Sequence, residues 1–227
     1  MVPRIRMLIR AYRKRWKSDR RGETELRLLP LLAKGGVAVD VGANKGVYTY
    51  FLSRLCDRVV AFEPNPRLAG TIGAYGLKNV EIRTKALSDV EGDATLHIPL
   101  SRAGRLQNNI ASLEHADGDS EAVAVPVSSL DAERLTDVSF VKIDVEGHEL
   151  SVLRGAEQTL RRDRPTLLVE VTDEITSPHA QEVFGLLEAW NYLVFQHHEG
   201  LLKHVSKLDP AEMKGRHRNY ICFPTQS

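Results

Sequence analysis

The sequence predicts an α/β fold in which a mostly parallel sheet carries helices on both faces. Short apolar runs rich in β-branched residues alternate with segments of helical periodicity along most of the chain, which is typical of a sheet built from β-α-β units. The run at residues 37–41 ends in an acid and a glycine-bracketed turn, Gly42 to Gly46. Glu63 ends the next such run, about 20 residues further on, where doubly wound folds place an acid for a ribose diol. These features predict a nucleotide-cofactor site at the carboxyl ends of the strands.

The elements follow from these patterns in chain order. A helix is expected at 23–34, ended by Gly35-Gly36, because glycine readily adopts the backbone conformation that stops a helix. Strands are expected at 37–41, 59–62, 80–86, 140–145, 166–171, 192–196 and 219–223. Helices are expected at 47–56, 67–75, 149–161 and 179–190. Two further strand-like runs, 94–100 and 122–127, flank a polar loop.

The length and composition predict one cofactor-binding domain with an extension. A chain of 227 residues buries a full core, and we expect a domain at 35–227 preceded by a helical extension at 1–34. Cys56 and Cys222 lie in apolar surroundings, which favours reduced, buried thiols over a disulfide framework. No apolar run reaches the ~20 residues of a membrane span, and no signal-peptide core is recognisable. A cytoplasmic location is therefore expected.

The beginning of the chain is strongly basic. Residues 1–21 contain nine Lys or Arg and one Asp, although the whole chain carries only +1. Apolar residues recur at helical spacing between them, which predicts a basic amphipathic helix. This helix either packs on the domain with its arginines in water, or contacts an anionic membrane surface or an anionic substrate. Nucleic acid is not expected as a partner, because the basic pattern does not continue into the body of the chain.

The glycine turn favours one cofactor over another. A dinucleotide fingerprint needs a central glycine to make room for a pyrophosphate, and the turn Gly42-Ala-Asn-Lys-Gly46 has none. Asp40 stands two residues before it, where a carboxylate would repel a pyrophosphate and suit the cationic amino group of a methionine moiety. The missing Cβ of Gly42 and Gly46 would let the backbone approach the ligand. The turn therefore predicts S-adenosylmethionine rather than a dinucleotide.

Four acids fall at one edge of the predicted sheet. Asp40, Glu63, Asp144 and Glu170 each lie at or near the end of a predicted strand, and the carboxyl ends of parallel strands form the ligand edge of such folds. A charge there needs a ligand, a metal or a hydrogen-bond partner. Asp144 and Glu170 could hold Mg²⁺ or Ca²⁺ through their oxygens, but we expect no obligatory metal.

The fourth predicted strand ends in a second group of polar residues. Asp144, Glu146, His148 and Glu149 follow one another closely. One interpretation is structural, since an acid such as Glu149 favours a helix N-terminus. The functional interpretation gives Asp144 and Glu146 to the cofactor or acceptor pocket and makes His148, Glu146 and Asp144 the candidate bases for a hydroxyl acceptor. His115, in the polar loop, is the other histidine retained as a candidate.

Together these segments resemble the FkbM family of methyltransferases. The resemblance is carried in order by DVGANKG at 40–46, FEPNP at 62–66, KALSD at 85–89 and KIDVEGHELSVLRGA at 142–156, and it spans about residues 35–195. It implies a class I, Rossmann-like doubly wound sheet whose last strand is antiparallel. It also implies O-methylation, typically of sugar or polyketide hydroxyls and sometimes of carboxylates of small metabolites.

The resemblance also implies roles for individual residues. The cofactor-binding residues would be Asp40, Gly42, Ala43, Asn44, Gly46, Tyr48, Glu63, Asn65, Leu87, Ser88 and Asp144. Among them, the 40–46 turn would hold the methionine portion, Glu63 and Asn65 the ribose site, and Leu87 and Ser88, with Asp89, the adenine border. Asn109 and Ser112 would line the acceptor wall.

Three functions stay open at this point. The first is an S-adenosylmethionine-dependent O-methyltransferase acting on a small molecule or glycan. The second is a dinucleotide oxidoreductase, and the third is a binding protein on the same fold. The sequence does not disclose the methyl acceptor or the oligomeric state.

Overall fold

The computed structural model describes residues 24–100, 119–171, 174–198, 201–208 and 219–225. The basic segment 1–21 and the loop residues Asn109, Ser112 and His115 lie outside the described residues, so the expectations placed on them stay predictions.

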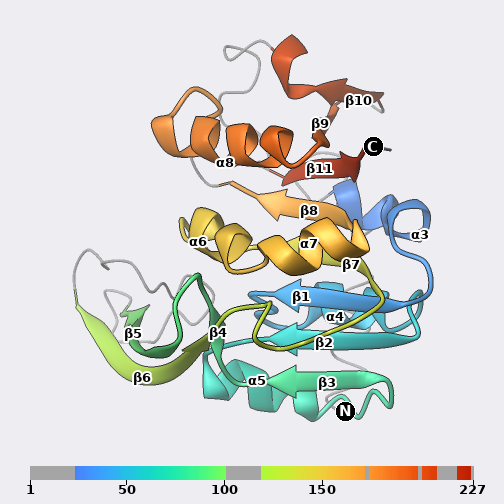
Figure 1. The fold of residues 1–227 in the computed structure, drawn as a ribbon. Coiled ribbons are helices and arrows are strands. Elements are labelled where there is room, and N and C mark those ends of the chain that lie inside the picture. The colour runs from blue at the N-terminus through green and yellow to red at the C-terminus, as the bar shows by residue number, and fades with distance from the viewer. Residues whose placement is uncertain (1–23, 101–118, 172–173, 199–200, 209–218, 226–227) are drawn as a thin grey trace.

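An eight-stranded sheet forms the centre of the fold (Figure 1). Its strand order is β10-β9-β11-β8-β7-β1-β2-β3. The bounds are β1 Val37–Val41, β2 Arg58–Phe62, β3 Val80–Arg83, β7 Val138–Ile143, β8 Thr166–Glu170, β9 Tyr192–His198, β10 Leu201–His204 and β11 Asn219–Pro224. The pairs among β1, β2, β3, β7 and β8 are parallel, whereas β11 runs antiparallel to both β8 and β9. The doubly wound sheet with an antiparallel last strand is therefore confirmed.

Helices cover both faces of this sheet. In Figure 1, α6, α7 and α8 lie in front of the strands and α4 lies behind them. The bounds are α3 Leu29–Leu32, α4 Val47–Leu52, α5 Pro66–Gly73, α6 Glu149–Arg154, α7 Glu157–Asp163 and α8 Pro178–Ala189, with short 3-10 turns η1 Thr24–Arg27 and η3 Val205–Lys207. None of the described helices is long and apolar enough to cross a membrane.

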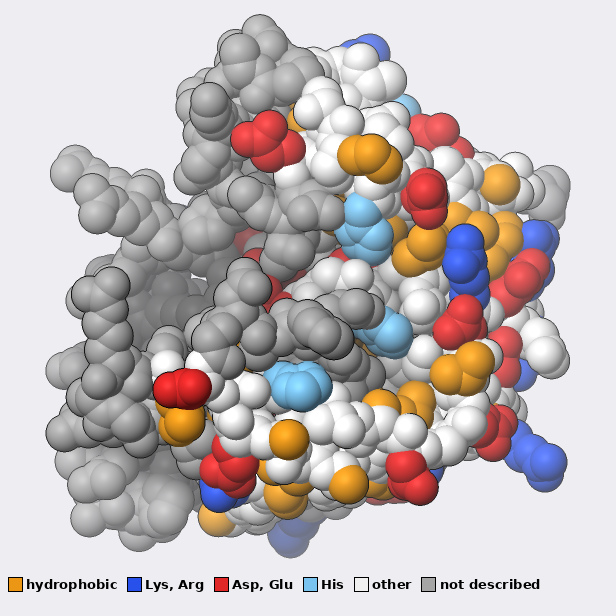
Figure 2. Space-filling model, turned by 90° about the vertical axis from the view of Figure 1, so that its left-hand side faces the viewer, with side chains coloured by type: hydrophobic (Ala, Val, Ile, Leu, Met, Phe, Trp, Pro, Cys, Tyr) orange, Lys and Arg blue, Asp and Glu red, His pale blue; other side chains and the backbone are white. Residues whose placement is uncertain are grey.

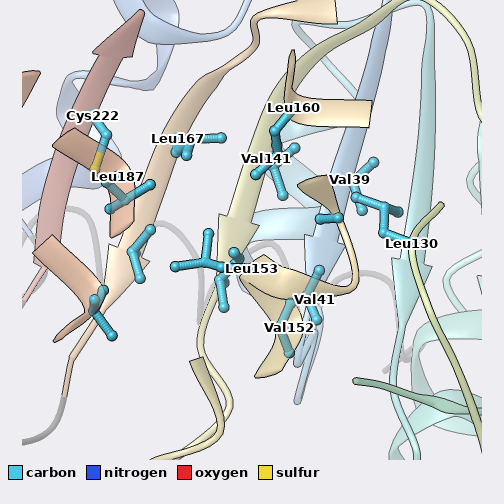
Figure 3. Close-up of a cluster of buried hydrophobic side chains, with 14 of the residues drawn as sticks. Val39, Val41, Leu130, Val141, Val152, Leu153, Leu160, Leu167, Leu187 and Cys222 are labelled. Carbon is cyan, nitrogen blue, oxygen red and sulfur yellow. The ribbon is translucent and has the colours of Figure 1, made fainter. Parts of the chain in front are cut away.

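The two faces of the strands pack into separate cores. Side chains alternate along a strand, so Val39 and Val41 of β1 pack towards α6 and α7 in the cluster that also contains Leu153 and Leu160 (Figure 3). Ala38 belongs to the opposite core, with residues of α4 and α3. Asp40 has the same parity as Ala38, which places it on the α4 face of the sheet.

The strand expected at 80–86 is two strands. It divides into β3, at the edge of the large sheet, and β4 Ala86–Leu87. β4 pairs with β6 Ser120–Ser128, which in turn pairs with β5 Gly92–Pro99 in a second, three-stranded sheet. The chain passes from one sheet to the other between β3 and β4. The alternation of residues along 80–86 does not reveal this change, because it depends on which strands pair.

Two expected helices also differ from the prediction. The segment 23–34 is a 3-10 turn followed by a four-residue helix rather than one helix, and Pro30 stands inside it, where proline removes a helical hydrogen bond. The segment 149–161 forms two helices, α6 and α7, with Gly155 and Ala156 between them. Strand β10, at the edge of the sheet, was not predicted.

Candidate active site

The candidate site lies at the carboxyl edge of the parallel strands. The arrowheads of β1, β2, β3 and β8 point to one side in Figure 1, and Figure 2 looks directly onto that side. Acidic side chains are visible near its centre, with histidine side chains around them. The ends of β1, β2 and β7 supply the groups described below.

Asp40 is a buried carboxylate with partners inside the protein. Its side chain is fully buried, and its Oδ2 accepts a hydrogen bond of 2.5 Å from Thr49 Oγ1 of α4. Burial raises the pKa of Asp40, against the opposing effects of Lys142 and of the Thr49 hydrogen bond. Asp40, which the sequence predicts to suit the cationic amino group of a methionine moiety, thus already has a hydroxyl donor and a cation beside it.

Lys142 is the cation that the sequence analysis did not assign to the site. It stands opposite Asp40 in the pairing of β7 with β1, and its side chain is only 3% exposed. Its Nζ lies 2.8 Å from Asp144 Oδ2, 3.9 Å from Asp40 Oδ1 and 4.8 Å from the centre of the Tyr48 ring. Burial opposes the charged ammonium, but the Asp144 and Asp40 carboxylates outweigh it and raise the pKa of Lys142. We call Asp40, Lys142 and Asp144 the ion cluster.

A signal for Lys142 was present in the sequence. A lysine between Val141 and Ile143, in a strand covered on both faces, cannot reach water easily, and a buried lysine is rare unless it is paired. The neighbouring strand end already held an acid. The missing information was that β7 lies next to β1, which the strand order supplies.

The glycines of the turn serve the packing of the protein itself. A Cβ on Gly42 would lie 1.9 Å from the carbonyl oxygen of Asp144, and the residue has φ of +74°. A Cβ on Gly46, also at positive φ, would lie 3.0 Å from Ile72 of α5. A cause within the protein is therefore visible for both glycines, the approach of the β7 end and of α5 to the turn, and the expectation that they also let the backbone approach a ligand stays a prediction.

Glu63 is held in place by two backbone amides. Asn44 N donates to Glu63 Oε2 at 2.6 Å, and Asn65 N donates to Glu63 Oε1 at 2.9 Å. Burial raises the pKa of Glu63 to about 7, although the two amide hydrogen bonds act in the other direction and Asp40 adds a smaller repulsion. The carboxylate is fixed but keeps acceptor capacity, since each oxygen has two lone pairs.

The remaining turn residues support this arrangement. Gly42 N and Ala43 N both donate to the Phe62 carbonyl oxygen, at 3.0 and 3.1 Å, so the turn is tied to the end of β2. The side chain of Asn65 caps α5 by accepting from Arg67 N at 3.0 Å. Asn65 therefore positions Glu63 through its backbone and starts the next helix through its side chain.

His148 contacts the segment that was expected to border the adenine. Its Nε2 lies 3.0 Å from Ser88 Oγ, and Ser88 Oγ donates to Asp89 Oδ1 at 3.1 Å. Since the serine hydroxyl donates to Asp89, it accepts from His148, which places the proton on Nε2. The side chain of Leu87 packs in the large core cluster, so a cofactor contact by Leu87 would have to come from its backbone.

The turn after β7 presents the other candidate bases. Asp144 is partly exposed, at 26%, beside Lys142. Glu146 is exposed and has φ of +51°, and partial burial of its carboxyl group together with Asp144 raises its pKa. Glu149 is fully buried and accepts from Gly147 N at 2.9 Å, while its other oxygen lies 2.9 Å from His179 Nε2 of α8. Glu149 therefore fixes the turn, and its role is structural.

The described residues place no group of three or more His, Cys, Asp or Glu side chains where they could hold a metal ion. Of the two acids considered for that purpose, Asp144 and Glu170, Asp144 is hydrogen-bonded to Lys142.

Comparison with known proteins identifies the family. The chain matches the family described as Methyltransferase FkbM domain over residues 40–194, which is more than half of its length and includes Asp40, Glu63, Asp144, Glu146 and His148. The chain belongs to the FkbM methyltransferase family. No curated protein matches it.

Solved structures agree on the fold. An FkbM methyltransferase from Methylobacillus flagellatus KT superposes with a TM-score of 0.52 at 18% identity and covers 85% of this chain, which spans only 45% of that protein. A precorrin 8w decarboxylase from Methanobacterium thermoautotrophicum superposes with a TM-score of 0.51 at 16% identity, and the match covers 90% of this chain and 91% of that protein. A putative methyltransferase from Streptococcus mutans, solved in complex with S-adenosylhomocysteine, gives 0.51 at 11% identity, covering 89% and 96%. The fold is the class I methyltransferase fold, and S-adenosylmethionine is the cofactor that this family and fold use, as the sequence predicts.

The residues of this FkbM domain fit that cofactor. Glu63 is a fixed, nearly buried carboxylate with acceptor capacity left for a ribose diol. The ion cluster supplies one net negative charge at the end of the neighbouring strands for a cationic ligand, since two carboxylates share one ammonium.

Proposed function

We propose that this FkbM domain is an S-adenosylmethionine-dependent O-methyltransferase that methylates a hydroxyl group of a glycan, a polyketide or another small metabolite. The observation that carries the proposal is the Glu63 carboxylate, held by two backbone amides beside the ion cluster. When bound, S-adenosylmethionine supplies an electrophilic methyl group on a sulfonium.

Binding of the cofactor would be divided between two strand ends. Glu63, after β2, would accept hydrogen bonds from the ribose hydroxyls, as acids at this position do in doubly wound folds. Asp144, the partly exposed member of the ion cluster, would face the cationic methionine end. Asp40, whose oxygens are buried, would keep the ammonium of Lys142 in place rather than contact the ligand.

Glu146 is the best-placed general base. A hydroxyl must lose its proton as the new bond forms, and a base with a raised pKa takes that proton more readily than an ordinary carboxylate. The pKa of Glu146 is raised by burial and by Asp144, and the residue is exposed where the turn meets the edge. His148 is the weaker candidate, because its Nε2 is already engaged with Ser88 Oγ, 3.0 Å away.

The charges near the site favour a neutral acceptor over an anionic one. Glu63, Asp144, Glu146 and Glu170 lie at or just after strand ends on this edge, and Lys142, the cation in contact with Asp144, is buried and paired. Arg83 and Lys85, at or just after the end of β3, are paired with Glu133. A carboxylate acceptor would meet repulsion from the acids at this edge, which are only partly screened at short range. A hydroxyl acceptor would not.

The test compares matched acceptors. The full-length protein is incubated with methyl-labelled S-adenosylmethionine and with pairs of neutral sugars and the corresponding uronic acids. We expect label in alkali-stable ethers from the neutral sugars. Label found only in alkali-labile esters of the acids would overturn the preference for a hydroxyl.

A matched pair of variants tests the base. Glu146→Gln should lower turnover by roughly 10²-fold, the lower end of general-base contributions, with the affinity for S-adenosylhomocysteine changed by less than about twofold. Glu188→Gln, an exposed acid on α8, should leave both unchanged. Equal turnover in the two variants would remove Glu146 from the catalytic role.

A further inference from the structure

Lys142 occupies a place where a charge is costly. Its side chain is 3% exposed in the middle of the sheet, and α4 covers it from the Tyr48 side. A buried ammonium is tolerated only with partners of opposite charge. Here the carboxylates of Asp40 and Asp144 provide the opposite charge, and the Tyr48 ring adds a cation–π contact. An apolar side chain would fill the same place in the strand without needing such partners.

The contacts of Lys142 are unequal. The ammonium makes a hydrogen bond of 2.8 Å with Asp144, the partly exposed acid, but lies 3.9 Å from the buried Asp40. The second oxygen of Asp40, Oδ2, is engaged by Thr49. Asp40 therefore acts as a buried counter-charge that keeps the ammonium in place, while the directed hydrogen bond goes to the acid at the edge.

We propose that Lys142 is a positioning residue of the cofactor site: it holds the Asp144 carboxylate in the orientation that receives the cationic end of the methyl donor. The inference rests on the proposed function, in which Asp144 contacts that end. Without the ammonium, the Asp144 side chain would be free to turn between several rotamers, and fixing it again would cost part of the binding energy.

A simpler role for Lys142 would be to neutralise Asp40 inside the protein. Lys142→Met alone does not separate the two roles, because it leaves Asp40 buried without its counter-charge and so destabilises the fold. The double variant Asp40→Asn/Lys142→Met removes both buried charges and keeps side chains of similar size. Replacing a buried ion pair by neutral groups is often tolerated, and this variant retains Asp144.

The experiment measures S-adenosylhomocysteine binding by calorimetry in the full-length protein. We expect the double variant to bind about tenfold more weakly than the wild type, and Asp144→Asn to cause a similar loss. Adding Asp144→Asn to the double variant should cause little further loss, because Lys142 acts through Asp144. A merely structural lysine predicts wild-type affinity in the double variant, and that result would overturn the inference.

Arg164→Met is the matched control for losing a partly buried cation. Arg164 binds the carbonyl oxygens of Trp190 and Asn191, at 2.7 and 2.8 Å, at the start of β8 and away from the carboxyl edge. The Arg164→Met variant should have a lower melting temperature, but its affinity for S-adenosylhomocysteine should change by less than about twofold. Wild-type protein that binds S-adenosylhomocysteine but methylates no acceptor would overturn the proposed function and leave the role of Lys142 standing.

Discussion

Glu63 shows how one residue can couple ligand binding to protonation. Its carboxyl group is nearly buried, at 5% exposed, and burial raises its pKa to about 7. The charged form is nevertheless the one that accepts hydrogen bonds from two amides and, in the proposed function, from a ribose diol. A ligand that donates to this carboxylate must therefore lower the pKa.

We predict that S-adenosylhomocysteine binding releases protons between about pH 6 and 7.5. A fraction of Glu63 is protonated in the free protein over this range, and the ligand favours its ionised form, so affinity should rise with pH towards 8. Calorimetry in two buffers of different ionisation enthalpy measures the protons released. Glu63→Gln should bind more weakly and abolish this release, whereas proton release that persists in the variant would assign it to another group.

The same shift has a consequence for the stability of the free protein. The folded pKa of Glu63 lies above its unfolded value, so the folded protein holds more protons between about pH 4.5 and 7. This group alone therefore makes the free energy of unfolding fall as pH rises through that range and level off above it.

At the scale of elements, a close approach to another segment occurs at the break between α6 and α7. A Cβ on Gly155 would lie 2.0 Å from the carbonyl oxygen of Ser88, so only glycine allows the helix to press on the segment after β4. Asp131 reinforces the junction: its backbone N–H donates to the Gly155 carbonyl oxygen, and its carboxylate accepts from Gln158 N and Thr159 N at the start of α7.

We predict that Gly155→Ala displaces the Ser88 segment. The overpacking should lower the free energy of unfolding by about 1–3 kcal/mol, and it should weaken S-adenosylhomocysteine binding if Ser88 borders the cofactor. Urea denaturation and calorimetry measure the two effects.

Gly185→Ala is the control within another helix. A Cβ there would meet no atom within 4 Å, and alanine is favoured over glycine in a helix by about 1 kcal/mol. The Gly185→Ala variant should have a free energy of unfolding equal to or higher than that of the wild type. A Gly155→Ala variant as stable as Gly185→Ala would contradict the steric explanation.

At the scale of the whole molecule, the two cysteines report on how the fold opens. Both are free and buried, as predicted. Burial, with a smaller contribution from Asp57, raises the pKa of Cys56 to about 11, and burial raises the pKa of Cys222 as well. Cys222 lies in β11 between two strands, whereas Cys56 lies after α4, outside the strands.

We predict that neither thiol reacts rapidly with a disulfide reagent in the native protein at pH 8. Cys56 should react first, through local opening, and Cys222 only at the rate of global unfolding, with a strong dependence on denaturant. Cys56→Ala and Cys222→Ala assign the two phases. Fast reaction of Cys222 without denaturant would mean that the sheet opens locally at β11.

The sequence by itself determined the alternation of strands and helices, the acids at the strand ends and the family, because apolar periodicity and short motifs are local properties of the chain. It did not determine that β4 leaves the main sheet, that Gly42 makes room for the Asp144 carbonyl, or that Lys142 lies beside Asp40. Each of these depends on which segments become neighbours in space. The tertiary structure decided them by setting β7 next to β1, where a buried cation and a buried acid that are about 100 residues apart in the chain become partners across adjacent strands.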